Sequence, residues 1–267
     1  MGTWRERREM VIGIARAKQF SPNSVEKDRA ILEAVVNRFQ GLIVSETELD
    51  KSLSASHRFL NMGRLPETIA WLKQREEEGA TVLNSAYGVE MCRRDRFDAL
   101  IRQHHLAVPP PNKDGACWLK RADGAAQHAD DVVYCQDATA LEQAKERFVQ
   151  RGINSFIVQP HVKGDLVKFY GVEPTGFFRT FYPGDDGDWK FCHEAVNGKP
   201  HHYFYQKEHL RATAEMLSRL ARVPIYGGDA VVTADGECYI IDFNDWPSFA
   251  RCRDEAAEAI VRAVALL

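Results

Sequence analysis

The sequence has few cysteines, and their spacing indicates neither a disulfide framework nor a metal framework. Six cysteines lie among 267 residues, and no two of them form a Cys-x-x-Cys pair. A chain of this length buries a core large enough to fold without disulfides. The spacing therefore excludes a small disulfide-rich scaffold and indicates reduced thiols in a reducing compartment.

Long apolar runs are also missing, and neither sign of charge dominates. No run approaches the roughly 20 apolar residues that span a bilayer, and the early apolar stretch at 10–15 is too short for a signal-peptide core. The formal net charge of −3 gives no general field for nucleic acid. We therefore expect a cytoplasmic protein that binds neither membrane nor nucleic acid, and whose anionic ligands are held by local basic residues.

The pattern of apolar residues changes along the chain. In the N-terminal part, short strands at 11–15, 42–44 and 81–83 alternate with helical stripes at 25–39 and 66–78, which favours a mainly parallel α/β lobe. A helix is expected over 87–105. The later segments have the pattern of strands at 116–121, 132–134, 156–159, 166–172, 177–182 and 189–193, with helices at 139–151, at 210–221 and at the C-terminus. We therefore predict an N-terminal α/β lobe, 1–84, followed by two lobes built on antiparallel sheet, 85–155 and 156–267.

The most informative segment is a predicted hairpin that carries acidic residues near its open end. Asp235-Gly236 lies between two strand-like runs and suits a two-residue turn, which needs positive φ. This turn would place Val231 opposite Ile240. It would also place Asp229 opposite Asp242, with both carboxylates on one face of the hairpin.

An amide oxygen joins the two carboxylates on this face. Asn244 lies two residues beyond Asp242, so strand alternation returns its side chain to the same side. Opposed carboxylates repel each other, and a cation between them relieves the repulsion. Oxygen ligands that leave positions for water and phosphate suit Mg²⁺. We therefore predict a Mg²⁺ site at Asp229, Asp242 and Asn244, with two exposed strand-end acids as the alternative.

Phosphate-binding loops of the common kinds are absent. The sequence contains neither Gly-x-x-x-x-Gly-Lys-[Ser/Thr] nor Gly-x-Gly-x-x-Gly. The candidate phosphate ligands are instead two strand lysines, Lys120 and Lys168. A turn about 174–175 would place Arg179 opposite Tyr170 and on the face of Lys168. A solvated sheet face is the alternative for each residue taken alone.

The order of these motifs resembles the ATP-grasp superfamily, and within it the inositol polyphosphate kinases of the inositol 1,3,4-trisphosphate 5/6-kinase type. Residues 241–249, Ile-Asp-Phe-Asn-Asp-Trp-Pro-Ser-Phe, resemble the D-x-N-x-x-P-[GS]-[YF] segment of the superfamily. Asn84-Ser85 with Asp95-Arg96 resembles the N-[SP]…D-R helix of these kinases. The likeness covers most of the chain and is weakest over 40–80. It implies an ATP-grasp fold in which the two antiparallel lobes sandwich ATP.

The resemblance implies roles for several residues in nucleotide binding. The residues that would contact ATP are Arg96, Lys120, Gln159, His161, Val162, Asp165 and Lys168, and Mg²⁺ would lie on Asp229, Asp242 and Asn244. Within this set, Asp165 lies where a ribose contact is expected. Residues 157–159 and 161–162 resemble a hinge strand that binds adenine through its backbone. Pro160 replaces the usual Glu there and removes one backbone donor.

The resemblance also implies a small, anionic substrate. Catalytic roles fall on Lys168, Arg179 and His128, and contacts with the substrate fall on Arg16, Lys18, His128, Arg179 and Ser248. We expect a Mg-ATP-dependent kinase that phosphorylates a hydroxyl of an inositol phosphate or a similar polyol phosphate, as a monomer or small homo-oligomer. Two alternatives stay open: a carboxylate–amine ligase that acts through an acyl phosphate, and a nucleotide-binding sensor without turnover.

Overall fold

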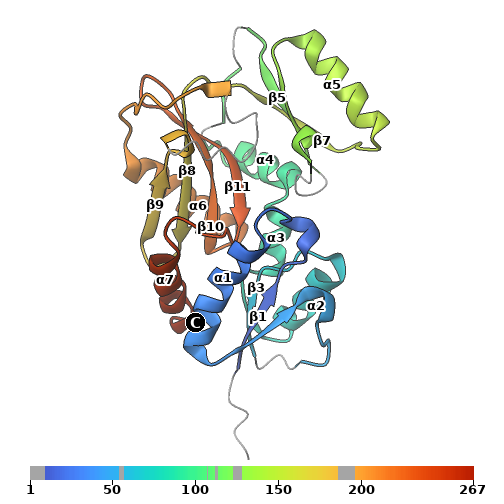
Figure 1. Cartoon of the computed structure of the whole chain (residues 1–267), viewed down its shortest axis with the longest axis vertical. Coiled ribbons are helices and arrows are strands. Elements are labelled where there is room, and N and C mark those ends of the chain that lie inside the picture. Colours follow the sequence, from blue (N-terminus) through green and yellow to red (C-terminus); the bar gives the residue numbers. More distant parts are fainter. Residues whose placement is uncertain (1–9, 54–56, 107, 112–113, 123–127, 186–195) are drawn as a thin grey trace, which may run out of the picture. The chain divides into compact units, whose positions relative to one another are not determined.

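The chain is divided into two compact units. The computed structural model describes residues 10–53, 57–106, 108–111, 114–122, 128–185 and 196–267. One unit comprises the residues up to Tyr87 together with Ser248–Leu267, and the other comprises Gly88–Pro247 (Figure 1). The last residues of the predicted 156–267 lobe thus belong to the first unit. No helix in the described ranges is long and apolar enough to cross a membrane.

The first unit is built on a four-stranded parallel sheet with the strand order β2-β1-β3-β4. Its strands are β1 (Val11–Ala15), β2 (Leu42–Ser45), β3 (Arg58–Asn61) and β4 (Thr81–Leu83), and its helices are α1 (Val25–Val36), α2 (Pro66–Glu77) and α7 (Arg253–Ala265). Sequence patterning predicted all of these except β3. That strand has four residues and begins and ends with polar ones, so it lacks an alternating signal.

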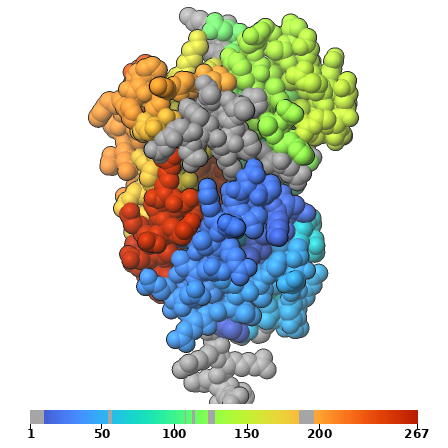
Figure 2. Space-filling view, in the orientation of Figure 1, coloured from blue at the N-terminus to red at the C-terminus, as the bar shows by residue number. Residues whose placement is uncertain are grey.

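Helix α1 shows why this unit folds. Its apolar stripe, which includes Ile31, Leu32 and Val35, is fully buried, and the helix packs beside β1 and α7. Its opposite side is polar and forms part of the blue surface in Figure 2. A one-sided apolar stripe at helical period is what drives such packing.

The second unit contains a small antiparallel sheet and a larger one. The small sheet has the order β6-β5-β7 and consists of β5 (Cys117–Arg121), β6 (Val132–Cys135) and β7 (Phe156–Pro160). Helix α5 (Ala138–Gln150) covers one of its faces (Figure 1). The core between them contains Leu119, Ala144, Phe148 and Ile153, all buried.

The larger sheet has the order β11-β10-β8-β9, and all of its strand pairs are antiparallel. It consists of β8 (Asp165–Val172), β9 (Phe177–Phe181), β10 (Ile225–Val232) and β11 (Cys238–Asp245). Helices α4 (Arg94–Gln103) and α6 (Lys207–Ala221) share an apolar core with one of its faces, which contributes Phe169, Phe178 and Phe243. The other face, which alternates with these residues, is left for polar side chains.

Two details of this unit differ from the sequence-based predictions. The single helix expected over 87–105 is two helices, α3 (Ala86–Met91), which crosses the boundary between the units, and α4. The break falls at Arg93, whose ψ of 139° is extended rather than helical. The strand expected over 189–193 lies outside the described residues.

The β10–β11 turn also differs from the prediction, although the acidic pair is placed as expected. The turn is one residue longer, because Thr233 N donates to Glu237 O at 2.9 Å and Gly236 takes a φ of +86°. Val231 therefore lies opposite Tyr239, not Ile240.

A β-bulge then restores the expected register at the far end of the hairpin. It lies between Asp229 and Ala230 and inserts Ile241 on the other strand, so Asp229 lies opposite Asp242.

Candidate active site

The polar face of the larger sheet carries two neighbouring rows of functional side chains. In the first row, Lys168, Asp229 and Asp242 are register partners on β8, β10 and β11. The Lys168 ammonium donates to Asp229 Oδ1 at 3.0 Å. The sequence predicted all three residues, and the structure brings them side by side.

In the second row, Arg179, Tyr170, Gly227 and Asn244 are register partners. The predicted pairing of Arg179 with Tyr170 is confirmed. Because positions two apart on a strand share a face, Asn244 lies on the face of Asp242 and Arg179 on the face of Lys168. Arg179 is exposed, and its guanidinium lies over the Phe177 ring, 5.1 Å from the ring centre.

The backbones of β10 and β11 approach each other closely at Gly228, next to the acidic pair. A Cβ atom on Gly228 would lie 2.2 Å from the carbonyl oxygen of Asp242 and 2.5 Å from Cζ of Phe169. Neither neighbour has room to retreat, since one is backbone and the other is a fully buried ring. Only glycine therefore fits here, and this contact holds the β11 backbone at Asp242 against β10.

Two more cations reach the acidic pair from other elements. Lys120 on β5 is 6% exposed, and its ammonium donates to the carbonyl of the bulge residue Ile241 at 3.0 Å. Arg94, the first residue of α4, places Nη2 3.5 Å from Oδ2 of Asp242. Helix α4 is held there by Phe97, whose ring stacks on Phe243 at 5.4 Å.

These charges shift the titration of the site. Desolvation by the surrounding protein raises the pKa of Asp242, but the positive charges of Arg94 and Lys120 outweigh it and hold that pKa below its usual range. Burial lowers the pKa of Lys120 to about 8, although the nearby Asp242 opposes this shift. Asp242 is thus ionised at neutral pH, and Lys120 is charged at pH 7 but loses its proton at a lower pH than an exposed lysine does.

The hinge strand β7 exposes backbone groups along one edge. His161 N donates to Ala116 O at 2.9 Å, so this residue turns its backbone groups toward β5. In an antiparallel pair the residues alternate between hydrogen-bonded and non-hydrogen-bonded positions. Pro160 therefore occupies a position that makes no bond to β5, and its missing N–H costs nothing. The carbonyl of Pro160 therefore points toward the free edge of the sheet.

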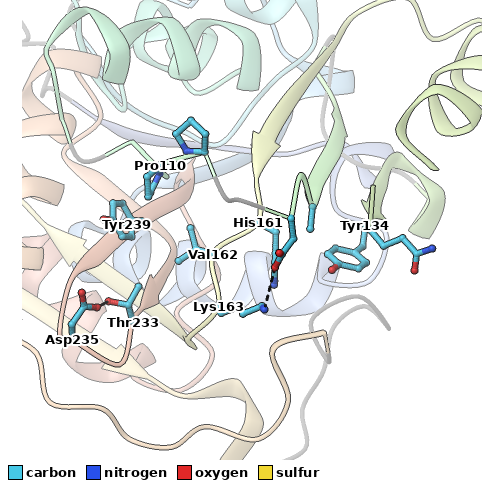
Figure 3. Close-up of a pocket in the computed structure, with 12 residues that line it drawn as sticks. Pro110, Tyr134, His161, Val162, Lys163, Thr233, Asp235 and Tyr239 are labelled. Atoms are coloured by element: carbon cyan, nitrogen blue, oxygen red, sulfur yellow. Dashed lines mark hydrogen bonds and ion pairs between the residues drawn. The ribbon is translucent and has the colours of Figure 1, made fainter. Parts of the chain in front are cut away.

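A pocket of about 410 Å³ lies beside the hinge. His161, Val162 and Lys163 line it from the hinge, and Thr233, Asp235 and Tyr239 line it from the β10–β11 hairpin (Figure 3). The indole of Trp118 donates to His161 Nδ1 at 3.1 Å and fixes the imidazole ring. Burial, helped by the charge of Lys163, lowers the pKa of His161. The imidazole is therefore neutral at pH 7 and offers the pocket a flat, uncharged surface.

Two residues assigned to the nucleotide by resemblance have other partners. Arg96 is exposed and pairs with Glu90 at 2.6 Å. Asp165 is 2% exposed, and its two carboxylate oxygens accept the backbone N–H groups of His201 at 2.7 Å and Tyr203 at 2.9 Å. The structure therefore shows that Asp165 holds the segment at 201–203, and a ribose contact of this residue stays a prediction.

The arginine next to Asp242 is Arg94, which the resemblance did not identify. Arg94 and Arg96 both stand near the start of α4, and the break at Arg93 decides which one faces Asp242. The buried stripe of Phe97, Leu100 and Ile101 shows the helical period, but the period alone does not say which arginine lies beside Asp242.

Gln159 is 5% exposed and pairs in register with Trp118, on the face of the small sheet that also carries Lys120. His128 is exposed at the start of a short 3₁₀ turn, where its N–H donates to Asp131 Oδ2 at 3.1 Å. A catalytic or substrate role for His128 stays a prediction.

Three of the predicted substrate residues belong to the first unit. Arg16 is almost fully buried, where it pairs with Asp28 at 3.3 Å and donates to Met62 O at 3.1 Å. These contacts give Arg16 a structural task within the unit. Lys18 is exposed and Ser248 is half-buried. Substrate contacts of these three residues stay predictions.

The donor set at the sheet face fits a hard divalent cation. Asp229, Asp242 and Asn244 provide oxygen donors only, as Mg²⁺ prefers. In the described ranges no cluster of three His, Cys, Asp or Glu side chains is poised around a metal, and Mg²⁺ at Asp229, Asp242 and Asn244 stays a prediction.

Comparisons with solved structures place this architecture. D-alanyl-alanine synthetase A from Vibrio cholerae has a TM-score of 0.65 at 11% identity, over 96% of this chain and 98% of that chain. The D-cycloserine synthetase DcsG has a TM-score of 0.65 at 14% identity, over 95% and 99%. An ATP-grasp RimK domain protein from Sphaerobacter thermophilus has a TM-score of 0.62 at 16% identity, over 96% and 99%.

By sequence alone, the chain matches no family model and no curated protein. Its likeness is therefore one of architecture, and it extends over nearly the whole of each neighbour. The two antiparallel sheets of the second unit agree with it. The fold of the chain is the ATP-grasp fold.

Proposed function

We propose that the protein is an ATP-dependent carboxylate–amine ligase. The observation that carries this proposal is the row of Lys168, Asp229 and Asp242, with Lys120 and Arg94 beside it, on an ATP-grasp fold. The similar structures include two synthetases and a D-alanine–D-alanine ligase from Coxiella burnetii, which has a TM-score of 0.60. Paired cations and carboxylates of this kind suit the alignment and charge neutralisation that phosphoryl transfer requires.

ATP would lie between the small sheet and the polar face of the larger sheet. The free edge of β7 would offer an adenine edge an acceptor at Pro160 O, and Val162 N, two residues further on, would be the donor. Lys120, Lys168 and Arg94 would hold the triphosphate, because they supply the cations nearest the acidic pair.

The acidic pair would hold magnesium together with the phosphates. Asp229, Asp242 and Asn244 supply its oxygen ligands, and the ion would neutralise charge that develops on the phosphate oxygens. The protein itself must orient the γ-phosphate, exclude water and hold the second substrate in line with it.

The proposed reaction has two steps. A carboxylate oxygen of the substrate attacks the γ-phosphorus, the bond to the β-phosphate oxygen breaks, and ADP leaves. The acyl phosphate then meets a neutral amine, whose nitrogen forms the amide bond while phosphate leaves and the amine loses a proton. Neither step needs a nucleophile from the protein. Arg179 stands on the same face as Lys168 and is the cation that we assign to the substrate carboxylate.

Trapping the acyl phosphate tests this proposal. The protein is incubated with Mg-ATP, hydroxylamine and a panel of amino acids and other carboxylic acids, and hydroxamate formation is measured. A ligase forms hydroxamate with at least one acid, and the Asp242→Asn variant forms none. An absence of hydroxamate with every acid, while ATP is consumed on addition of a polyol phosphate, contradicts the proposal.

An inositol phosphate kinase is the second candidate, and two residue types favour it. The acidic pair consists of two aspartates, and the residue paired with Asp229 is Lys168, whereas ligases of this superfamily more often carry Glu and Arg at the positions of Asp242 and Lys168. Transfer from labelled ATP to an inositol phosphate, with a stable phosphoester as product, supports this candidate over the ligase.

A further inference from the structure

The two carboxylates of the candidate metal site each already have a cationic partner in the protein. The ammonium of Lys168 lies 3.0 Å from Oδ1 of Asp229, and Nη2 of Arg94 lies 3.5 Å from Oδ2 of Asp242. All four residues belong to the second unit. The oxygens that would bind a metal are therefore the oxygens that bind the protein's own cations.

Arg94 uses only part of its hydrogen-bonding capacity in this arrangement. Nη1 donates to the carbonyl of Arg121 at 3.2 Å, while the 3.5 Å contact of Nη2 with Asp242 is long for a hydrogen bond. Nε is buried, and it finds no hydrogen-bond partner within the described residues. A guanidinium has five N–H donors in a fork that matches phosphate oxygens. The side chain is thus only partly satisfied and can accept an anion.

The balance of charge around the pair is positive. Three cations, Lys120, Lys168 and Arg94, lie around the carboxylates of Asp229 and Asp242. A third carboxylate, Asp98, acts on Lys120 but is itself paired with Arg102. Lys120 is 6% exposed, so water does little to screen its charge. A free divalent cation entering this site is repelled by the excess charge and must also displace Lys168 or Arg94. A triphosphate is attracted by the same excess.

We propose that Arg94 and Lys168 keep the carboxylate pair closed to metal until the phosphates of a nucleotide draw both cations away. The exchange keeps every charge paired, because the cations pass to phosphate oxygens while the carboxylates pass to the metal. Divalent metal therefore binds together with nucleotide or after it, and not before. The nucleotide part of this proposal rests on the proposed function, whereas the exclusion of metal by Arg94 does not.

Manganese binding tests the proposal, because free Mn²⁺ is measured directly by its electron paramagnetic resonance signal. After subtraction of the Mn²⁺ that a non-hydrolysable ATP analogue binds in a protein-free control, the wild-type protein is expected to bind Mn²⁺ at least about tenfold more tightly with the analogue than without it, since the exchange frees two charged contacts. In the Arg94→Met variant, Mn²⁺ alone is expected to bind about tenfold more tightly than in the wild type. The same variant is expected to bind the analogue about tenfold more weakly.

Three further variants sharpen the result. Arg219→Met removes a surface ion pair with Glu173 in the same unit and is expected to match the wild type in both measurements. Arg94→Lys keeps the charge and is expected to keep Mn²⁺ out. Arg96→Met tests the residue that the resemblance assigned to phosphate. Thermal unfolding checks that each variant is folded, and tighter binding of Mn²⁺ cannot arise from unfolding.

Some results would overturn the proposal. It is wrong if the wild type binds Mn²⁺ alone as tightly as with the analogue, if Arg94→Met behaves as the wild type, or if Arg96→Met shows the expected changes in place of Arg94→Met. Failure of the nucleotide binding on which the proposed function depends has a different signature. In that case the wild type does not bind the analogue even with Mn²⁺, while the binding of Mn²⁺ alone still reports whether Arg94 excludes metal.

Discussion

Asp229 on β10 lies directly opposite Asp242 on β11, and the two carboxylates share the polar face of one sheet. Like charges in this relationship repel each other, and the protein offsets the repulsion with Lys168 on one side and Arg94 on the other. Such an arrangement has little value for stability alone, since two apolar residues would pack the position without opposing charges. Its value lies in what the carboxylates bind.

Replacing Asp242 by Asn is expected to abolish nucleotide turnover and to weaken Mn²⁺-dependent binding of ATP, because the metal loses a charged ligand. Thermal unfolding is expected to change little, since the variant loses an attraction to Arg94 but also a repulsion from Asp229. Glu208→Gln, in the exposed first turn of α6 in the same unit, is the matched control. Retention of metal-dependent binding by Asp242→Asn would exclude Asp242 as a metal ligand.

The affinity for Mg-ATP is expected to fall as the pH rises above about 8, because burial lowers the pKa of Lys120 to about 8 and the neutral amine no longer attracts phosphate. Lys120→Arg is expected to move this fall to higher pH, since a guanidinium stays charged. Calorimetric titration between pH 7 and 10 measures both. An affinity of the wild type that stays constant to pH 10 contradicts the assignment of Lys120 to the phosphates.

Deprotonation of Lys120 has the opposite effect on stability: it weakens the binding of phosphate but raises the free energy of unfolding. Between pH 8 and the usual pKa of 10.5, the unfolded chain holds a proton on this lysine that the folded chain has lost. The cost of burying the charged ammonium is therefore present in full below pH 8 and is relieved as the pH rises toward 10.5.

Gly228→Ala is expected to destabilise the second unit, because its Cβ would meet the Asp242 carbonyl at 2.2 Å and Phe169 at 2.5 Å. Overpacking of this kind costs about 1–3 kcal/mol or more. The strands must also separate next to Asp242, so metal-dependent binding of nucleotide is expected to weaken. Urea unfolding and calorimetry follow the two effects, and a variant that matches the wild type in both would show that β10 and β11 are not held as described.

Asp165→Asn is expected to lower the free energy of unfolding by about 1–3 kcal/mol, because a buried carboxylate that accepts two backbone N–H groups becomes neutral. The affinity for ATP is expected to change less than the stability does, since the carboxylate holds the segment at 201–203. Chemical unfolding and nucleotide titration are compared on the same variant. A large loss of affinity for ATP with unchanged stability would support the ribose contact that the resemblance implied for Asp165.

Strand and helix periodicity predicted most elements of this fold, and the acidic pair came from the hairpin signal. That success required two errors to cancel. The turn is one residue longer than Asp235-Gly236 alone would make it, which shifts the strand register by one residue. The bulge at Ile241 shifts the register back, so Asp229 still lies opposite Asp242. A bulge has no sequence signal of its own, because it is set by packing across the sheet.

Tertiary contacts determine the two features of the site that the sequence did not predict, the role of Arg94 and the partners of Asp165. The choice between Arg94 and Arg96 depends on where α4 starts, and packing of Phe97 on Phe243 sets that start. The partners of Asp165 lie 36 and 38 residues further along the chain. Neither relationship follows from local pattern, because local pattern fixes periodicity and not the partner.

The fate of a carboxylate oxygen tests the central claim most directly. Carboxylic acids labelled with ¹⁸O are incubated with the protein, Mg-ATP and amines, and the released phosphate is examined by mass spectrometry. Transfer through an acyl phosphate places one ¹⁸O atom in the inorganic phosphate, and its release requires both the acid and the amine. ADP formation with unlabelled phosphate, or with the phosphoryl group on a hydroxyl acceptor, would contradict the ligase account.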